Sequence, residues 1–306
     1  MDPVTEEGPT VPEAVPSIAP YPREALEQVL AVIDVQPDPA AGPDWFTGGS
    51  YGPSRSRIFG GQVLAQSLIA AAKTVDSSRP VHSLHGYFLR PGDPRLPISF
   101  TVERLRDGHS FSARRTHAIQ RGEALLSMIS SYQEPADGLD HQVEMPVVPG
   151  PDELPSLDTQ FGNSDIPMVQ RLLRERPVDM RHVEGPIFLH PGPDQVAHQA
   201  VWIRAGAAMP DDPLLHTALM AYASDYSLLE SFLRRHGLSW ATPGMKSASL
   251  DHAMWFHRPA RMDEWLLYTQ ESPSASGARA LGLGRLFTRD GVLVASVAQE
   301  GMMRVP

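Results

Sequence analysis

The sequence predicts an α+β protein of two similar units, each an antiparallel sheet that wraps around one long helix. A chemically similar segment occurs twice and ends in the dipeptide Arg-Pro, at Arg90 in the first copy and at Arg258 in the second. The same spacing places Glu103 on Glu271, and constant spacing over tens of residues indicates an internal duplication. In each copy a long apolar run precedes several short strands that turn residues separate, which is an α+β plan.

Composition excludes several classes of protein. The 306 residues carry a formal net charge of −10, with two lysines against 24 arginines, and an acidic chain without a basic run is a poor nucleic-acid binder. The absence of cysteine excludes disulfides and thiolate nucleophiles. No apolar stretch approaches the ~20 residues of a membrane helix, and the acidic start lacks the features of a signal peptide. We therefore expect no nucleic-acid partner, no membrane span and a cytoplasmic location.

The first unit is predicted over residues 22–140. Before it, residues 1–21 are rich in proline and acid and contain too little apolar surface to offset their ordering entropy, so we expect a disordered tail. Residues 21–35 show the apolar spacing of a short amphipathic helix. From Gly60-Gly61 to Lys73 the chain is apolar nearly all round, which predicts a helix buried on most sides.

Strands are expected after this helix, at residues 85–89, 97–105, 110–120 and 124–133. Asp107-Gly108 and Arg121-Gly122 are hairpin-type connections, so these strands should be antiparallel. Residues 141–190 are again rich in proline and acid, and we interpret them as a linker with one short helix near residues 169–174.

The second unit is predicted over residues 191–306 and repeats the plan. A helix over residues 213–235 precedes strands at residues 249–256, 265–271, 278–288 and 292–299. A further strand at residues 199–203 has no certain partner in the first copy. The exposed sheet edges of the two units predict that the halves pair edge to edge.

The two long helices differ in one respect. The first contains no acid, whereas the second contains Asp225 in an otherwise apolar stretch. A partly buried carboxylate there could orient or deprotonate a water molecule. Alternatively, Ser224 or Asp225 could cap a helix that continues through Leu228 to Arg235. The two roles are compatible, because a helix N-terminus also holds an anion and offers N–H groups to a developing oxyanion.

The usual catalytic and metal-binding signatures are absent from the sequence. There is no Gly-x-Ser-x-Gly elbow, no phosphate-binding loop and no His-Glu-x-x-His motif. His82 and His85 would face opposite sides of a strand, so no metal site is expected. Taken singly, Ser249 at a strand start is explained by ordinary edge polarity, and Gln299 at a strand end by exposure to solvent.

Several long segments nevertheless carry a specific pattern. They are residues 59–62, 82–93, 106–115, 223–226, 250–259, 271–275, 290–296 and 299–301, and they include Phe59-Gly60-Gly61-Gln62 and Ala223-Ser224-Asp225-Tyr226. In this order they resemble the acyl-CoA thioesterase II family, the TesB-type double-hotdog thioesterases. The likeness runs from about residue 25 to the end and weakens between about residues 150 and 195. It implies two fused hotdog domains, which agrees with the plan predicted from the residues.

The resemblance also implies a site. The family's catalytic aspartate, threonine or serine, and glutamine, which together hold the attacking water, fall on Asp225, Ser249 and Gln299. Gly60 and Gly61, at a helix start, are candidate oxyanion or substrate-binding residues, because glycine lets a substrate approach closely.

The first copy is expected to hold a degenerate site. A rough alignment places Gly61 or Gln62 opposite Asp225 and Val81 opposite Ser249, and only Gln133 retains its residue type. A water site of the kind implied for the second copy would then lack its acid and its hydroxyl.

The implied activity is hydrolysis of fatty acyl-CoA to free fatty acid and CoA by direct attack of water, without a cofactor. The resemblance further implies a homo-oligomer. One alternative is a catalytically weak protein that binds acyl-CoA. Another is a hotdog-fold hydratase, a class that usually carries an aspartate and a histidine a few residues apart, whereas Asp225 has no such partner before His236.

Overall fold

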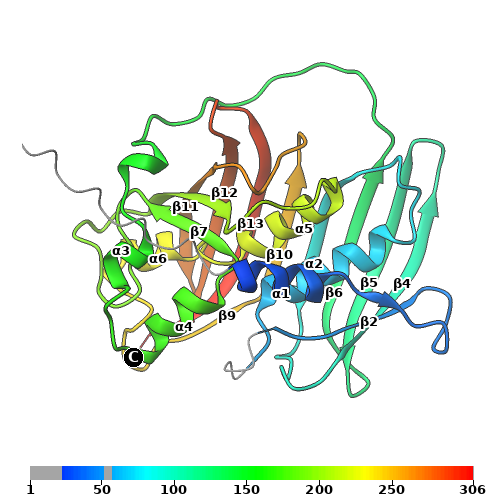
Figure 1. Ribbon diagram of the computed structural model, residues 1–306, viewed down its shortest axis with the longest axis horizontal. Coiled ribbons are helices and arrows are strands. Elements are labelled where there is room, and N and C mark those ends of the chain that lie inside the picture. Colours follow the sequence, from blue (N-terminus) through cyan, green and yellow to red (C-terminus); the bar gives the residue numbers. More distant parts are fainter. Residues whose placement is uncertain (1–22, 52–56, 306) are drawn as a thin grey trace, which may run out of the picture.

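A computed structural model describes residues 23–51 and 57–305 of the chain. The predicted tail over residues 1–21 lies outside this part. Within the described residues, thirteen strands form one continuous antiparallel sheet, and the helices α1, α2 and α5 lie together across its middle (Figure 1). This arrangement confirms the predicted α+β class with two fused hotdog units.

The first unit contains most of the elements expected from the sequence. They are α1 (Arg23–Ile33), β1 (Gln36–Pro37), β2 (Trp45–Gly48), α2 (Gly60–Ala72), β3 (Val81–Phe88), β4 (Ile98–Asp107), β5 (Phe111–Gln120) and β6 (Glu123–Gln133). The turn between β5 and β6 has positive φ at Arg121 (51°) and Gly122 (79°), as a two-residue hairpin turn requires. In the sheet the strands follow the order β1-β2-β4-β5-β6-β3.

In the second unit the corresponding strands follow in the reverse order along the sheet. Its elements are β7 (Val178–His182), β8 (His198–Ala205), α5 (Pro213–Ser224), α6 (Glu230–Arg235), β9 (Lys246–Ser249), β10 (Asp251–Phe256), β11 (Leu266–Ser276), β12 (Arg279–Thr288) and β13 (Leu293–Arg304). The sheet continues as β10-β13-β12-β11-β8-β7, with β9 on β13 beside β10. The strand predicted at residues 199–203 therefore has a counterpart, β2, which the sequence did not reveal because β2 is only four residues long.

The segment interpreted as a linker holds more structure than expected. It contains η1 (Pro151–Glu153), α3 (Leu157–Phe161), α4 (Pro167–Glu175) and β7. The short helix expected near residues 169–174 is α4, which begins with Pro167 at a position where a missing N–H costs nothing. β7 was missed and adds a strand to the outer edge of the second unit by pairing with β8. β7 has only five residues, and four of them are buried without alternation, so it carries no strand pattern that the sequence could reveal.

The helix predicted over residues 213–235 is broken. It begins as expected, because the Asp212 side chain accepts the N–H of Leu214 at 2.9 Å and Pro213 occupies the first turn. α5 then ends at Ser224, and α6 begins at Glu230. Apolar residues continue at helical spacing through the break, so periodicity alone could not reveal it.

The two units join edge to edge through β3 and β10. Their register pairs Tyr87 with Asp251 and Ser83 with Trp255, which confirms the expected pairing of the halves. The predicted strand over residues 249–256 is divided in two: Ser249 ends β9, and β10 starts at Asp251. Both strands pair with β13, so the sheet stays continuous past the division.

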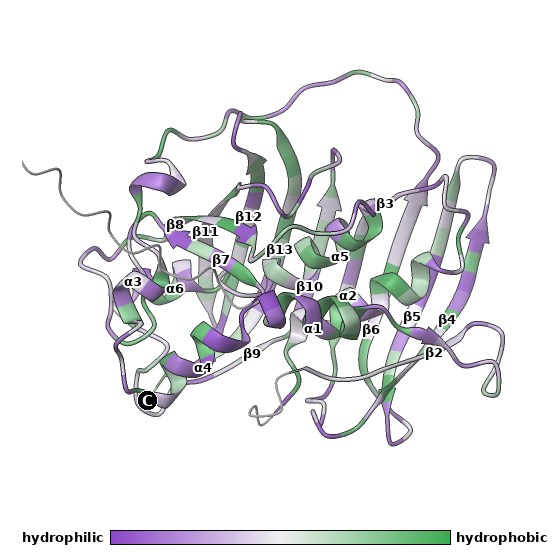
Figure 2. Ribbon diagram, viewed as in Figure 1, coloured by the Kyte–Doolittle hydropathy of each residue, from purple (hydrophilic) through white to green (hydrophobic). Residues whose placement is uncertain are grey.

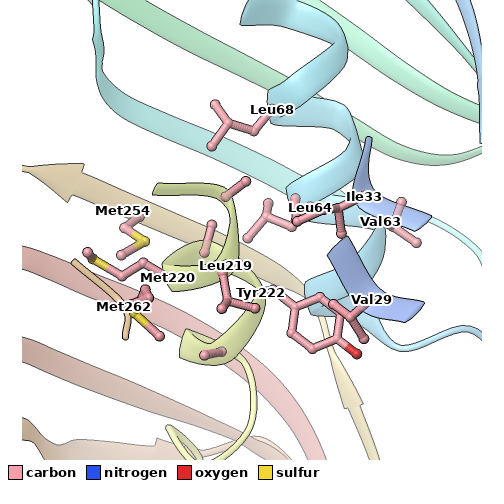
Figure 3. Packing of buried hydrophobic residues seen from close by; sticks show 14 of the residues in the cluster. Val29, Ile33, Val63, Leu64, Leu68, Leu219, Met220, Tyr222, Met254 and Met262 are labelled. Carbon is pink, nitrogen blue, oxygen red and sulfur yellow. The ribbon is translucent and has the colours of Figure 1, made fainter. Parts of the chain in front are cut away.

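The core is shared between the units. Figure 2 colours much of α2 and α5 green, as hydrophobic, and α2 contacts both α5 and the sheet. In Figure 3 Leu64 and Leu68 of α2 lie towards Leu219 of α5, with Met254 of β10 beyond. As the sequence predicted, α2 is buried on most sides. Because one apolar cluster spans both helices, burial of this surface fixes how the end of α5 meets the start of α2.

Candidate active site

The carboxylate of Asp225 lies where the end of one helix meets the start of another. Asp225 follows the last residue of α5, and the N-terminal turn of α2 has no side-chain cap of its own. Instead, the backbone N–H of Gly61 donates to Oδ2 of Asp225 at 2.9 Å. The positive end of α2 thus receives a negative charge from the other unit.

Three aromatic rings hold this junction together. Phe59, directly before α2, stacks on Tyr226 with ring centroids 4.7 Å apart and meets Tyr222 edge to face at 5.1 Å. Any side chain at Gly61 would collide with the backbone carbonyl of Tyr222, so glycine is required for this close approach. The aromatic contacts and the glycine set the position of Asp225, which lies between the two tyrosines in the sequence.

Ser249 and Gln299 reach the same carboxylate from the sheet. The Ser249 hydroxyl, at the end of β9, donates to Oδ1 of Asp225 at 3.2 Å. The Gln299 amide, from β13, donates through Nε2 to that oxygen at 2.9 Å and to the Ser249 hydroxyl at 2.8 Å. The structure therefore brings the three residues predicted from the sequence into direct contact.

The environment of this trio favours proton transfer. Burial raises the pKa of Asp225 above the ordinary aspartate value of 3.8, although the nearby His252, the Gln299 amide, the Gly61 N–H and the Ser249 hydroxyl all act to lower it. Gln299 is buried, whereas Asp225 and Ser249 each keep part of their surface exposed. A buried carboxylate with a raised pKa is suited to accept a proton from a bound water.

The capping interpretation of Ser224 and Asp225 is wrong. The residue before α6 is Leu229, which makes no side-chain capping bond. The Ser224 hydroxyl lies 2.9 Å from the carbonyl oxygen of Ala221, in α5, and 2.9 Å from Nε2 of His252, so it does not cap α6. Asp225 does meet a helix N-terminus, but it is that of α2, from the other unit.

The first copy differs from the rough alignment of the two halves. Gly61 lies at the start of α2, whereas Asp225 follows the end of α5, so the two are neighbours in space and not equivalent positions. Gln62 is buried, and its side-chain oxygen Oε1 accepts the N–H of Tyr51 at 2.9 Å. Its side-chain Nε2 donates to the backbone carbonyl of Gly49 at 3.2 Å and to Oε1 of Gln66 at 3.1 Å. These contacts give Gln62 a structural role.

A buried histidine that the sequence did not single out completes the network. Nδ1 of His252, on β10, lies 2.6 Å from Oε1 of Gln299, and its Nε2 lies 2.9 Å from the Ser224 hydroxyl. The one available signal was strand alternation, which points His252 to the same inner face as the buried Met254 and so marks it as a polar residue in the core.

The comparisons with known proteins agree with this architecture. The chain matches the family described as acyl-CoA thioesterase over residues 174–302 and the acyl-CoA thioesterase N-terminal domain over residues 48–133. Acyl-coenzyme A thioesterase 8 of Homo sapiens is 38% identical over 296 residues, which cover 90% of this chain and 89% of that protein. Acyl-CoA thioesterase 2 of Haemophilus influenzae is 37% identical over 265 residues, covering 85% and 92%.

A solved structure extends the likeness to three dimensions. The crystal structure of an acyl-CoA thioesterase II from Mycobacterium marinum superposes with a TM-score of 0.75 at 43% identity, covering 91% of this chain and 98% of that one. The chain belongs to the acyl-CoA thioesterase family, with the TesB-type double-hotdog fold.

Proposed function

We propose that Asp225, Ser249 and Gln299 hold the water with which this acyl-CoA thioesterase hydrolyses fatty acyl-CoA to free fatty acid and CoA. The observation that carries the proposal is the convergence of Ser249 and Gln299 on one oxygen of Asp225. These donors orient the carboxylate, and Asp225 and Ser249 are each partly exposed as residues. No other acid enters the inner stretch of either long helix.

The proposed reaction needs no covalent enzyme intermediate. Asp225 accepts a proton as the oxygen of water attacks the thioester carbonyl carbon, and the carbonyl oxygen becomes an oxyanion. Collapse of this intermediate breaks the carbon–sulfur bond, and the CoA thiolate leaves and takes up a proton. Water and acyl-CoA supply every atom of the products, and no step of the proposed reaction uses a metal or another cofactor.

The start of α2 is the proposed source of oxyanion stabilisation. The N–H of Gly61 is engaged by Asp225, so its part is to hold the base. The N–H of Gly60 has no acceptor among the described residues, and a first-turn amide of a helix has none within the helix itself. Gly60 is also close to the carboxylate, because a Cβ there would lie 2.8 Å from Oδ2 of Asp225. We assign the oxyanion contact to Gly60.

Release of CoA is the test. Purified protein is mixed with saturated acyl-CoA esters of different chain length, and the free thiol is followed with a thiol reagent. Steady release that Asp225→Asn abolishes supports the proposal. Tight binding of acyl-CoA without thiol release would favour the binding-protein alternative, and addition of water to an enoyl-CoA without thiol release would favour the hydratase.

We also propose that the protein forms a homo-oligomer through the outer face of its sheet. Tyr87, Ile129 and Trp255 lie on one face of the adjoining strands β3, β6 and β10, with 64%, 43% and 38% of their surface exposed. Large apolar side chains gathered on one face are typical of an association surface. Trp255→Glu should reduce the assembled mass in size-exclusion chromatography with light scattering, and an unchanged mass would contradict this surface.

The remaining expectations from the sequence concern a membrane span and the cellular location. Within the described residues no helix has the length and hydrophobicity to cross a bilayer. The cytoplasmic location expected from the sequence stays a prediction, which cell fractionation would test.

A further inference from the structure

His252 occupies a fully buried position between the end of α5 and the strand that carries Gln299. Its ring is 0% exposed and bridges Ser224 Oγ, 2.9 Å from Nε2, to Gln299 Oε1, 2.6 Å from Nδ1. The ring contacts neither Asp225 nor Ser249 through a hydrogen bond. Its hydrogen-bonded link to the carboxylate therefore runs through Gln299.

The amide of Gln299 has one orientation that satisfies its neighbours. A carboxylate can only accept hydrogen bonds, so the group facing Oδ1 of Asp225 must be the Nε2 amide, which also donates to Ser249. The amide oxygen then faces Nδ1 of His252. An amide turned by 180° would place its oxygen against the carboxylate and its hydrogens against the histidine.

This orientation requires a hydrogen on Nδ1 of His252. A bare Nδ1 would put two acceptors 2.6 Å apart, which is repulsive. Two arrangements provide the hydrogen. In one, the ring is neutral with a bare Nε2 that accepts the Ser224 hydroxyl. In the other, the ring carries both hydrogens and Ser224 donates to the Ala221 carbonyl. The bond from Nδ1 to Gln299 is the same in both.

We propose that His252 is a positioning residue that fixes the amide of Gln299, so that both amide hydrogens point to Asp225 and Ser249. The inference rests on the proposed function of that trio. Without the histidine the amide is free to turn, and its oxygen then meets the negative charge of Asp225. Such a contact disfavours the carboxylate form that is required to accept a proton from water.

Burial favours the neutral arrangement of the ring, whereas the carboxylates around it oppose that arrangement. Burial lowers the pKa of His252, against the opposing effects of Asp225, the Gln299 bond and Asp251. Asp251 is held elsewhere, because its carboxylate accepts the N–H of Glu300 at 2.7 Å. A neutral ring with its hydrogen on Nδ1 gives a directed chain from the Ser224 hydroxyl through His252 and Gln299 to Asp225.

The test compares His252→Leu with His252→Asn. Asparagine can place its Nδ2 amide where Nδ1 lies and so keep the donor to Gln299, whereas leucine fills the space without a donor. We expect His252→Leu to lower kcat by about 10- to 100-fold, the range for leaving one buried partner unpaired, with KM little changed. The acid limb of its pH profile should move to higher pH. His252→Asn should recover most of the loss.

A double variant separates positioning from general damage. If His252 acts through Gln299, adding His252→Leu to Gln299→Ala should lower kcat no further. His216→Leu is the matched control. His216 lies in α5, is also buried at 2% exposure, and accepts the backbone N–H of Met262 at its Nδ1. This variant should lower the melting temperature and leave kcat within about twofold, because His216 shares no hydrogen-bond partner with Asp225, Ser249 or Gln299.

The outcomes distinguish this inference from the proposed function. A wild-type kcat for His252→Leu, or an equal loss in the Gln299→Ala background, would overturn the positioning role while the trio stands. A wild-type kcat for Gln299→Ala would overturn both. If His252→Leu does not fold, His252→Gln, which reaches towards Ser224 but places no donor at the Nδ1 position, replaces it with the same expected loss.

Discussion

The backbone N–H of Gly61 donates to the carboxylate of Asp225 at 2.9 Å, although 164 residues separate the two along the chain. Gly61 opens the long helix of the first unit, and Asp225 follows the long helix of the second. The bond caps a helix end that has no cap of its own and steadies a charge that burial opposes. The candidate active site therefore lies at the junction of the two units, and each unit contributes to it.

Replacement of Asp225 by asparagine should remove the base. We expect Asp225→Asn to lower kcat by ~10²–10⁴, the usual contribution of a positioned general base. The far-ultraviolet circular dichroism spectrum should stay that of the wild type. Thiol release at saturating acyl-CoA is the measurement, and near-wild-type turnover would refute the assignment of the base.

The pH profile of the wild-type enzyme should carry the signature of this carboxylate. Burial raises the pKa of Asp225, and the proposed mechanism needs the charged form. Activity should therefore fall as the pH drops through a pKa above 3.8, the ordinary aspartate value. A kcat/KM profile that stays flat down to that value would show that another group accepts the proton.

The role of Ser249 is expected to depend on its hydroxyl. The hydroxyl donates to Asp225 and accepts from Gln299, and threonine can make the same two bonds. Ser249→Thr should stay active. Ser249→Ala should lose activity by about 10- to 100-fold, since both the bond to Asp225 and the bond from Gln299 are removed. Melting temperatures should change little. Equal activity of the two variants would mean that the hydroxyl takes no part.

Gln62 provides a comparison between structural and catalytic glutamines. Gln62→Ala leaves the N–H of Tyr51 and the carbonyl of Gly49 without the bonds that Gln62 makes to them. We expect a loss of roughly 1–3 kcal/mol in the free energy of unfolding and a near-wild-type kcat. Gln299→Ala should show the reverse pattern. Comparable losses of kcat at both positions would indicate a working site in the first unit.

The second unit expressed alone, as residues 191–306, should be neither monomeric nor fully active. Removal of β3 would expose the edge of β10, and an unpaired strand with an apolar face tends to associate. Removal of α2 would also take away the Gly61 bond to Asp225. Light scattering and thiol release are the measurements. A monomeric, fully active fragment would contradict the shared site described here.

Local patterns in the sequence were sufficient for most of the fold. Apolar runs predicted the long helices, alternation of apolar and polar residues predicted the strands, and glycine-containing turns predicted the antiparallel hairpins. These signals depend on neighbouring residues alone. The duplication predicted two units that pair edge to edge, which the β3–β10 register confirms. The short strands β2 and β7 were missed, since four and five residues are too few for a pattern.

For the candidate site, the sequence by itself determined the chemistry available. It showed one acid, Asp225, in an apolar helix, and the family resemblance added Ser249 and Gln299. Only the tertiary structure decided how these groups are used. The second helix ends at Ser224, packing of α2 against α5 brings the Asp225 carboxylate to Gly61, and the inner face of the sheet brings His252 to Gln299. Contacts between residues this distant in the chain follow from the burial of a shared core, which no local pattern encodes.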